Sequence, residues 1–410
     1  DDKLFVKMMF RRVVFFLVAS FLHAGVASSL FSTPVKTVTI SGGTHGNEYT
    51  GIWCIKAIEK QRELFNANAE ATNAPDTKVI NVFKEYPSLS IDTLLANPKA
   101  YMANRRFIDT DMNREFSIKK LQRTTETCSE ENDASCDSSQ TSLPYESIRA
   151  KEIESMFGAP KTGSTGGDGD ANSDIVIDLH TTTANMGITL IFTEGDALMS
   201  AAAAYALHKC KTEYGYANVH ILLLPKTEKN DRTHLPSVGK HDFTIEVGPT
   251  PQGVLRHDIV EQTEAALHSL LEFLHLSNME LENKTTGATV LDRLRSAFPN
   301  GVPCYQSAPA VGAKELHGKI QWPTLDDNPN FPAAMVHKSL QDRDYQPLRT
   351  GAPLFVGLDG AVIPYDGSYG DEVLLMFVNE GGYYYSSSGT GIGVAVFSRY
   401  DFETGNNVEA

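Results

Sequence analysis

The feature that most constrains the fold of this chain is a repeated alternation of short apolar runs with longer amphipathic stretches. The apolar runs have the length of strands and read KTVTISG, TKVINVF, DIVIDLH, GITLIFTEG, NVHILLLP and FTIEVGP. The stretches between them predict helices near residues 47–65, 145–157, 197–214 and 258–278. Because nearly continuous apolar strands that alternate with helices are typical of an open sheet covered on both faces, we predict an α/β fold with a mostly parallel, doubly wound sheet.

The character of the sequence changes after about residue 281. Short strands broken by proline and glycine follow, such as GAPLFVGLDGAVIPYDG and VLLMFVNEGGYYY, without a long amphipathic helix. We therefore expect an α/β domain over residues 31–285 and a smaller β-rich domain over residues 286–410. Two stretches rich in polar residues or glycine, near 124–142 and 161–173, are interpreted as surface insertions.

Residues 1–30 form a segment that resembles a signal peptide. Two arginines precede a short apolar run and a series of small residues, in RRVVFFLVASFLHAGVASS. This pattern favours the secretory route or an organelle entered through it. No later segment reaches the roughly 18 to 20 apolar residues of a membrane span, so we expect no stable span in the mature chain.

Charge and cysteine content exclude some kinds of partner and site. The 410 residues carry a formal net charge of -15, which argues against binding to nucleic acid or to an anionic membrane surface. The five cysteines have no C-x-x-C spacing and therefore do not form a zinc ribbon. Cys128 and Cys136 could pair in an oxidising compartment, and free thiols are the equal alternative.

Candidate catalytic residues follow the predicted strands, where ligand sites of open α/β sheets lie. His45 and Glu48 come after the first strand, His180 ends DIVIDLH, and Glu246 lies within FTIEVGP. Two histidines and one carboxylate with an open position are the ligand set of a hydrolytic zinc site. Each residue taken alone also fits a structural role, and it is the shared location that favours a metal.

Three further groups fit the same chemistry. Glu246 in an apolar strand would be desolvated and have a raised pKa, which suits a general base that later acts as an acid. Asp178, two residues before His180, points to the same side and either orients that ligand or makes a buried hydrogen bond. The segment NRRFIDTDMNREF places arginines and Asn113 on one loop, as a fork for a carboxylate or as a surface salt-bridge cluster.

Taken together, the motifs resemble the aspartoacylase branch of the zinc carboxypeptidase-like superfamily, which includes succinylglutamate desuccinylases. The matching pieces run in order from about residue 35 to 385: GGTHGNE, RFIDTDMNREF, LPYESIRAKEI, DLHTTTANMG, IEVGPTPQGVLRHDI, LQDRDYQPLRTGAPLF and FVNEGGYYY. As an ordered set they are highly specific.

The resemblance implies a role for each matching residue. His45, Glu48 and His180 would bind one zinc ion per chain, and Glu246 would activate water and then protonate the leaving amine. Arg106 would polarise the scissile carbonyl and stabilise the oxyanion. Substrate would be held by Asn113 and Arg114 and covered by Tyr383 from the β-rich domain, while Asp111 would support the arginines.

The departures from the family pattern concern specificity. Members that prefer aspartate carry an arginine ten residues before the general base and a lysine four residues after the substrate tyrosine. Pro236 and Ser387 stand in those places, and the sequence leaves open whether Arg232 or His234 substitutes. Several segments look more like the branch that acts on N-acyl aromatic amino acids.

We therefore expect a zinc amidohydrolase of small N-acyl amino acids with aromatic or uncharged side chains. The alternatives are an N-acetylaspartate deacetylase, a metallocarboxypeptidase and a non-catalytic binding protein. The expected partner is a small-molecule substrate. Homo-oligomerisation stays open, as do the natural substrate and the final compartment.

Overall fold

A computed structural model of the chain describes residues 33–67, 80–124, 142–157, 172–283, 288–308, 318–328, 331–384 and 391–408. The expected targeting segment, nearly all of the two polar insertions, both cysteines of the suggested pair and Ser387 lie outside these residues. Among the described helices, none combines the length and the apolar character that a bilayer span requires.

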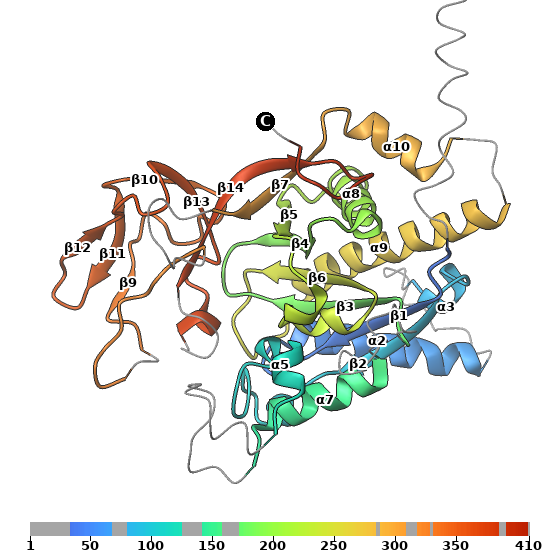
Figure 1. The fold of residues 1–410 in the computed structure, drawn as a ribbon, viewed down its shortest axis with the longest axis horizontal. Coiled ribbons are helices and arrows are strands. Elements are labelled where there is room, and N and C mark those ends of the chain that lie inside the picture. The colour runs from blue at the N-terminus through green and yellow to red at the C-terminus, as the bar shows by residue number, and fades with distance from the viewer. Residues whose placement is uncertain are drawn as a thin grey trace, which may run out of the picture.

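An 11-stranded sheet forms the centre of the molecule (Figure 1). Its strands lie in the order β2-β1-β3-β6-β4-β5-β7-β14-β13-β10, and β8 also pairs with β14. From β2 to β7 every neighbouring pair is parallel except β6 and β4. The bounds are β1 Thr37–Gly42, β2 Ser90–Leu95, β3 Ile175–Thr181, β4 Gly187–Thr193, β5 Val219–Leu224, β6 His241–Gly248, β7 Val302–Ser307, β8 Lys319–Ile320, β10 Pro347–Arg349, β13 Glu372–Met376 and β14 Ile392–Tyr400.

Helices cover both faces of this sheet, which confirms the predicted doubly wound α/β class. On one face α2, α8 and α9 pack on β1, β3, β4 and β6, and on the other α7 packs with η3. The bounds are α2 Tyr49–Asn66, α3 Val82–Glu85, α4 Pro98–Met102, η1 Met112–Arg114, α5 Ile118–Leu121, α7 Tyr145–Phe157, α8 Ala197–Thr212, η2 Lys229–Asp231, η3 Leu235–Val238, α9 His257–Asn283, α10 Val290–Ala297 and η4 Gly381–Tyr384.

Side chains alternate along the central strands, so one face of the sheet contributes to the hydrophobic core and the other face carries the candidate site. Ile177 and Leu179 of β3 lie in the hydrophobic cluster shared with α2, α8 and α9, as does Ile245 of β6. Since successive side chains point to opposite faces, His180 and Glu246 project to the other side of the sheet. Polar groups are thereby placed on the face that α7 and η3 cover only in part.

One predicted strand is wrong. Of the run TKVINVF, the described part consists of two residues without regular structure and the start of the short helix α3, and β2 lies further on at Ser90–Leu95. Asn81 is the physical reason, because its side-chain oxygen accepts hydrogen bonds from the backbone N–H groups of Phe83 and Lys84 at 3.1 and 3.3 Å. An asparagine that caps a first helical turn outweighs the β propensity of the valines around it.

The C-terminal region adds strands to the same sheet and builds a second, smaller one. In the second sheet, β11 (Pro353–Gly357) pairs with β9 (Ala334–Val336) and β12 (Val362–Pro364). Its core is a separate cluster that includes Trp322, Phe355 and Tyr365. Because β7 pairs in parallel with β5, the backbone hydrogen bonding continues from the α/β part into the β-rich part. Figure 1 shows β9 to β13 gathered at one end of the molecule.

Candidate metal centre and active site

Close packing of the loop between β1 and α2 is the reason for a glycine next to His45. A Cβ atom on Gly46 would lie 2.1 Å from the carbonyl carbon of Ala100, so no other residue fits there. The N–H group of Gly46 donates to the carbonyl of Arg106 at 3.1 Å. This close approach holds the loop that carries His45 and Glu48 against the segment that carries Arg106.

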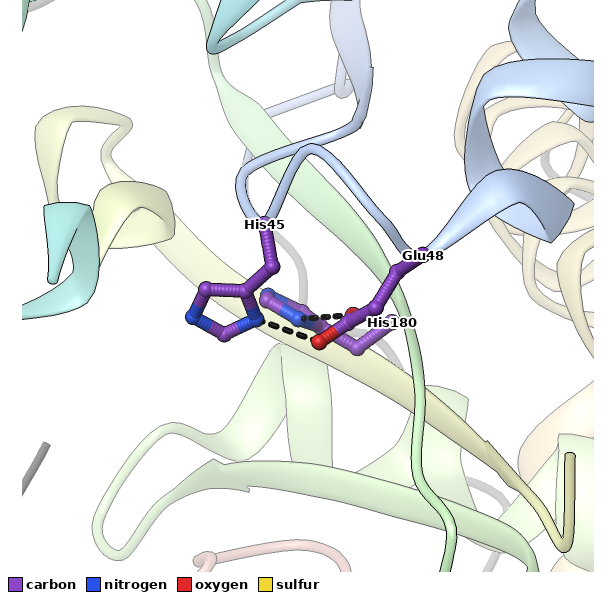
Figure 2. A group of neighbouring side chains, drawn as sticks. All are labelled: His45, Glu48 and His180. Carbon is purple, nitrogen blue, oxygen red and sulfur yellow. Dashed lines mark hydrogen bonds and ion pairs between the residues drawn. The ribbon is translucent and has the colours of Figure 1, made fainter. Parts of the chain in front are cut away.

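His45, Glu48 and His180 converge on one point (Figure 2). The Glu48 carboxylate lies between the two imidazoles, with Oε1 2.5 Å from Nδ1 of His45 and Oε2 2.9 Å from Nδ1 of His180. One ligand atom from each of the three residues lies within 4.8 Å of the other two. Two imidazole nitrogens and a carboxylate at this spacing fit a single divalent metal ion with a coordination position left open.

Two buried aspartates hold the histidine rings from behind. Asp178 Oδ2 lies 2.6 Å from Nε2 of His180, and Asp111 Oδ1 lies 3.3 Å from Nε2 of His45. Thr44 fixes Asp178 in turn, since its hydroxyl donates to the carboxylate at 2.8 Å. A carboxylate on Nε2 favours the proton at that nitrogen, which would leave the lone pair of Nδ1 available to a metal ion. The donor set and its support therefore both fit a metal.

The ionisation of Glu48 agrees with this arrangement. Burial raises the pKa of its carboxyl, but the neighbouring His45 and His180 outweigh burial and hold the pKa well below its usual range. The backbone N–H of Thr181 donates to Oε2 at 3.0 Å. Glu48 is therefore a permanent carboxylate, as a metal ligand must be.

Glu246 lies beside His180 on the next strand. The two residues are register partners between β6 and β3, and both line the same cavity. The Glu246 carboxyl is partly open to the cavity and receives no hydrogen bond from the described residues. Burial raises the pKa of Glu246 well above its usual value, and the carboxylates of Glu48 and Glu380 add to this effect. A carboxyl in this state can accept and return a proton.

Arg106 is buried in the same cavity wall. Its guanidinium donates to Asp111 Oδ2 at 3.2 and 3.0 Å and lies 3.4 Å from Glu48 Oε1. Burial lowers the pKa of Arg106, but Asp111 and Glu48 outweigh burial and raise it above its usual value. A fixed positive charge therefore lies at the edge of the metal centre.

The cavity has a volume of about 240 Å³ and includes the remaining residues expected to contact substrate: Asn113, Arg114 and Tyr383. Asn113 and Arg114 belong to η1, which Asp111 caps by accepting from the backbone N–H of Asn113 at 3.0 Å. Tyr383 comes from η4, so the C-terminal region supplies part of the wall. Five apolar residues also line the cavity: Ile191, Phe192, Leu222, Leu224 and Phe377.

Sequence reasoning did not single out two buried glutamates that hold this site together. Glu380 accepts from the backbone N–H groups of Thr183 and Gly382 at 2.8 and 2.7 Å, which joins η4 to the loop after β3. Glu146 accepts from the backbone N–H groups of Ile108, Asp109 and Thr110 at 2.7, 3.0 and 3.2 Å. Both lie within motifs quoted above, and membership of those motifs was the signal available.

Glu146 should matter more for stability than its distance from the metal suggests. Glu146→Gln replaces an oxygen that accepts two backbone N–H groups with an amide that donates. Because a buried donor left without an acceptor costs about 1 to 3 kcal/mol, we expect the free energy of unfolding to fall by about 2 to 4 kcal/mol, measured by urea unfolding. Glu152→Gln, at a half-exposed site on the same helix, is the control and should change it by less than about 0.5 kcal/mol. Equal stability of the two variants would contradict the role given to Glu146.

Comparison with known proteins identifies the family. Residues 79–274 match the family model described as the succinylglutamate desuccinylase/aspartoacylase catalytic domain, and residues 315–390 match the AstE/AspA barrel-sandwich hybrid domain. An N-acyl-aromatic-L-amino acid amidohydrolase (carboxylate-forming) from Xenopus laevis is 34% identical over 86% of this chain and 92% of its own length. This chain belongs to the succinylglutamate desuccinylase/aspartoacylase family.

Other members of the family are similar to the same extent. An aspartoacylase from Danio rerio is 34% identical over 85% of this chain and 88% of its own length. Among solved structures, murine aminoacylase 3 matches with a TM-score of 0.63 and 25% identity over 92% of this chain and 99% of its own. The family assignment confirms the resemblance seen in the motifs. The family includes both aromatic-acylase and aspartoacylase relatives. Membership alone therefore does not identify the substrate, and the residues that line the cavity must be considered.

Proposed function

We propose that this protein is a zinc-dependent amidohydrolase that deacylates small N-acyl amino acids to a carboxylate and a free amino acid. Side chains that are aromatic or uncharged are favoured over that of N-acetylaspartate. The observation that carries the proposal is the convergence of His45, Glu48 and His180 with Glu246 beside them in the same cavity.

Zinc is the metal that this donor set favours, because two imidazoles, one carboxylate and an open position are typical of hydrolytic zinc sites. When bound, the zinc ion supplies Lewis acidity, which polarises a carbonyl and makes water easier to deprotonate near neutral pH. One ion per chain is expected.

Glu246 is the proposed general base and acid. Its carboxylate takes a proton from water as the water oxygen bonds to the acyl carbon. The same proton is then delivered to the amide nitrogen as the C–N bond breaks, so the amine leaves neutral and the acyl group leaves as a carboxylic acid. The remaining proton of the attacking water then passes from this acid to the amine, which gives the carboxylate and the ammonium form of the amino acid. Its position in register with His180 supports this role.

Arginines in the cavity are proposed to stabilise the negative charges of the substrate and of the oxyanion formed during hydrolysis. Arg106 is proposed to stabilise the oxyanion that develops on the acyl oxygen, because its guanidinium is held charged next to the metal ligands. Asn113 and Arg114 are proposed to bind the α-carboxylate of the substrate. Tyr383 would close the cavity from the C-terminal region, residues 286–410, and Asp111 and Asp178 would act through the groups they orient.

The size and lining of the cavity support a small, largely apolar substrate. A volume of about 240 Å³ accommodates an acyl amino acid but not a long peptide, and five of the residues that line the cavity are apolar. Pro236, at the place of the arginine found in aspartate-preferring relatives, is buried within η3 and offers no charge. Aspartoacylase activity remains the second candidate, since an aspartoacylase is as similar in sequence as the aromatic acylase.

A substrate panel tests the proposal. The zinc-loaded protein should release acetate from N-acetyl-tyrosine at least ten times faster, in kcat/KM, than from N-acetyl-aspartate. Amine release is measured per bound zinc, with an N-blocked dipeptide as the carboxypeptidase substrate. Absence of amine release from every N-acyl amino acid would refute the proposal, and faster hydrolysis of N-acetyl-aspartate would select the second candidate.

A further inference from the structure

A second carboxylate, on Asp242, lines the same cavity as the proposed general base. Asp242, Thr244 and Glu246 alternate along β6, so their side chains project to the same face of the sheet, and all three line the cavity. Four residues of a strand span about 13 Å, which places Asp242 at the far end of the cavity from the metal centre.

Two basic side chains and a hydroxyl hold the Asp242 carboxylate in place. Oδ1 forms an ion pair with a guanidinium nitrogen of Arg232, and Oδ2 lies 2.9 Å from Nε2 of His234. Thr193 of β4 donates to Oδ2 at 2.9 Å. Burial raises the pKa of Asp242, but His234 and Arg232 outweigh it and hold the pKa well below its usual value. Both residues considered as replacements for a missing substrate-binding cation are therefore already paired within the protein.

The position of this cluster identifies the part of the substrate it would meet. The backbone N–H of Leu235 donates to Oδ1 of Asn113 at 3.0 Å, and that of Phe116 donates to the carbonyl of Thr233 at 3.2 Å. The loop that carries His234 is thus bonded to the loop proposed to hold the α-carboxylate. Since the α-carboxylate and the side chain are bonded to one carbon atom, a substrate whose α-carboxylate is held at Asn113 has its side chain within reach of the loop that carries His234, which pairs with Asp242.

We propose that Asp242 is a specificity-determining residue, whose carboxylate occupies the place in which a substrate carboxylate would otherwise pair with Arg232 and His234. The inference rests on the proposed function and concerns the side chain of the substrate. An acidic side chain meets a like charge there and finds both cations already neutralised. A neutral side chain is accepted. One that ends in a hydrogen-bond donor is favoured, because a carboxylate has about four acceptor positions and three are used.

A pair of substrates with equal reach separates charge from size. N-acetyl-tyrosine and N-acetyl-4-carboxyphenylalanine differ at the para position, where one has a hydroxyl and the other a carboxylate. The zinc-loaded wild-type protein should prefer the tyrosine substrate by roughly 30- to 100-fold in kcat/KM. Asp242→Asn removes the charge at constant shape and Asp242→Ala also opens the space, so each should reduce this preference at least tenfold.

Two further variants test whether the change in substrate preference comes from the pairing of Asp242 with Arg232. Asp242→Asn should raise kcat/KM for N-acetyl-4-carboxyphenylalanine, because it frees the guanidinium of Arg232. The double variant Arg232→Met with Asp242→Asn should lose this increase, because the guanidinium is absent. Asp196→Asn is the matched control: Asp196 pairs with His241 at 2.7 Å on the opposite side of β6, and asparagine keeps its capping of α8. It should leave the substrate preference unchanged.

Binding to an inactive protein keeps the test independent of turnover. In the Glu246→Gln background, calorimetry should show that Asp242→Asn tightens binding of N-acetyl-4-carboxyphenylalanine at least tenfold relative to N-acetyl-tyrosine. An unchanged ratio in folded Asp242 variants, by rate and by binding, overturns the inference, as does equal use of both substrates by the wild type. Failure of the wild type to hydrolyse either substrate contradicts the proposed function instead, and the binding ratio still decides the role of Asp242.

Discussion

Substitution of Glu246 by glutamine is expected to lower kcat for N-acetyl-tyrosine by about 10³- to 10⁴-fold while the metal stays bound. Glutamine has nearly the same shape but cannot accept the proton of the attacking water or return it to the leaving amine. Because Glu246 is register partner to a proposed metal ligand and not one of the convergent three, metal content should remain that of the wild type. Single-turnover rates and metal analysis of the same preparation provide the measurement.

The control for this variant is a carboxyl with a similar environment far from the cavity. Glu264 on α9 is partly buried, and burial raises its pKa as it does that of Glu246. Glu264→Gln should keep kcat within about twofold of the wild type, since it touches none of the cavity residues. A Glu246→Gln protein that turns over at more than a tenth of the wild-type rate with full metal would show that another group moves the proton.

Removal of the metal by a chelator is expected to abolish hydrolysis without unfolding the protein. The elements that carry the ligands pack through a hydrophobic cluster that includes Ile40, Ile55 and Leu179, so the fold does not depend on the ion. Far-ultraviolet circular dichroism should be unchanged, and one equivalent of zinc should restore activity. Because a ligand present at 1,000 times its Kd stabilises by about 4 kcal/mol, the apoprotein should melt several degrees lower.

Histidine substitutions sharpen this prediction. His180→Ala removes one of three ligands and should weaken zinc binding by at least about 10³-fold, measured by competition with a chromogenic chelator. His257→Ala, at an exposed site at the start of α9, should bind zinc like the wild type. Full activity of a preparation shown to be free of metal, or wild-type zinc affinity in His180→Ala, would contradict the assigned ligand set.

The convergence of His45, Glu48 and His180 at the candidate metal centre could be predicted from the sequence because it depends on local patterns. Apolar runs located the strands of His180 and Glu246, and ligand groups of an open α/β sheet gather beyond its strand ends. The helix that starts at Tyr49 and the strand that contains Glu246 were both expected from periodicity, and both are present. The raised pKa of Glu246 was likewise expected from its apolar neighbours, and burial is its main cause.

Features that depend on contacts between distant segments could not be predicted. β2 was missed because its alternating polar residues resemble a loop, and the more apolar run before it begins a helix at an asparagine cap. Glu146 serves backbone groups 36 to 38 residues earlier in the chain, a relationship that no periodicity encodes. The pairing of Arg232 and His234 with Asp242 depends on how a loop folds back on its own strand. From the sequence alone, each basic residue must be counted as available to bind a substrate, because its acidic partner is visible only in the folded structure.

The continuity of the sheet from β5 through β7 into β14 determines how substrate can enter and product can leave. A separately tethered cap could swing aside as a rigid body, but here such a rotation would have to break a row of backbone hydrogen bonds. Because η4 lies between β13 and β14 of this sheet, the wall that it supplies is held at a fixed place relative to the strands of His180 and Glu246. A catalyst built in this way discriminates against bulky chains by its architecture, before any individual side chain contributes.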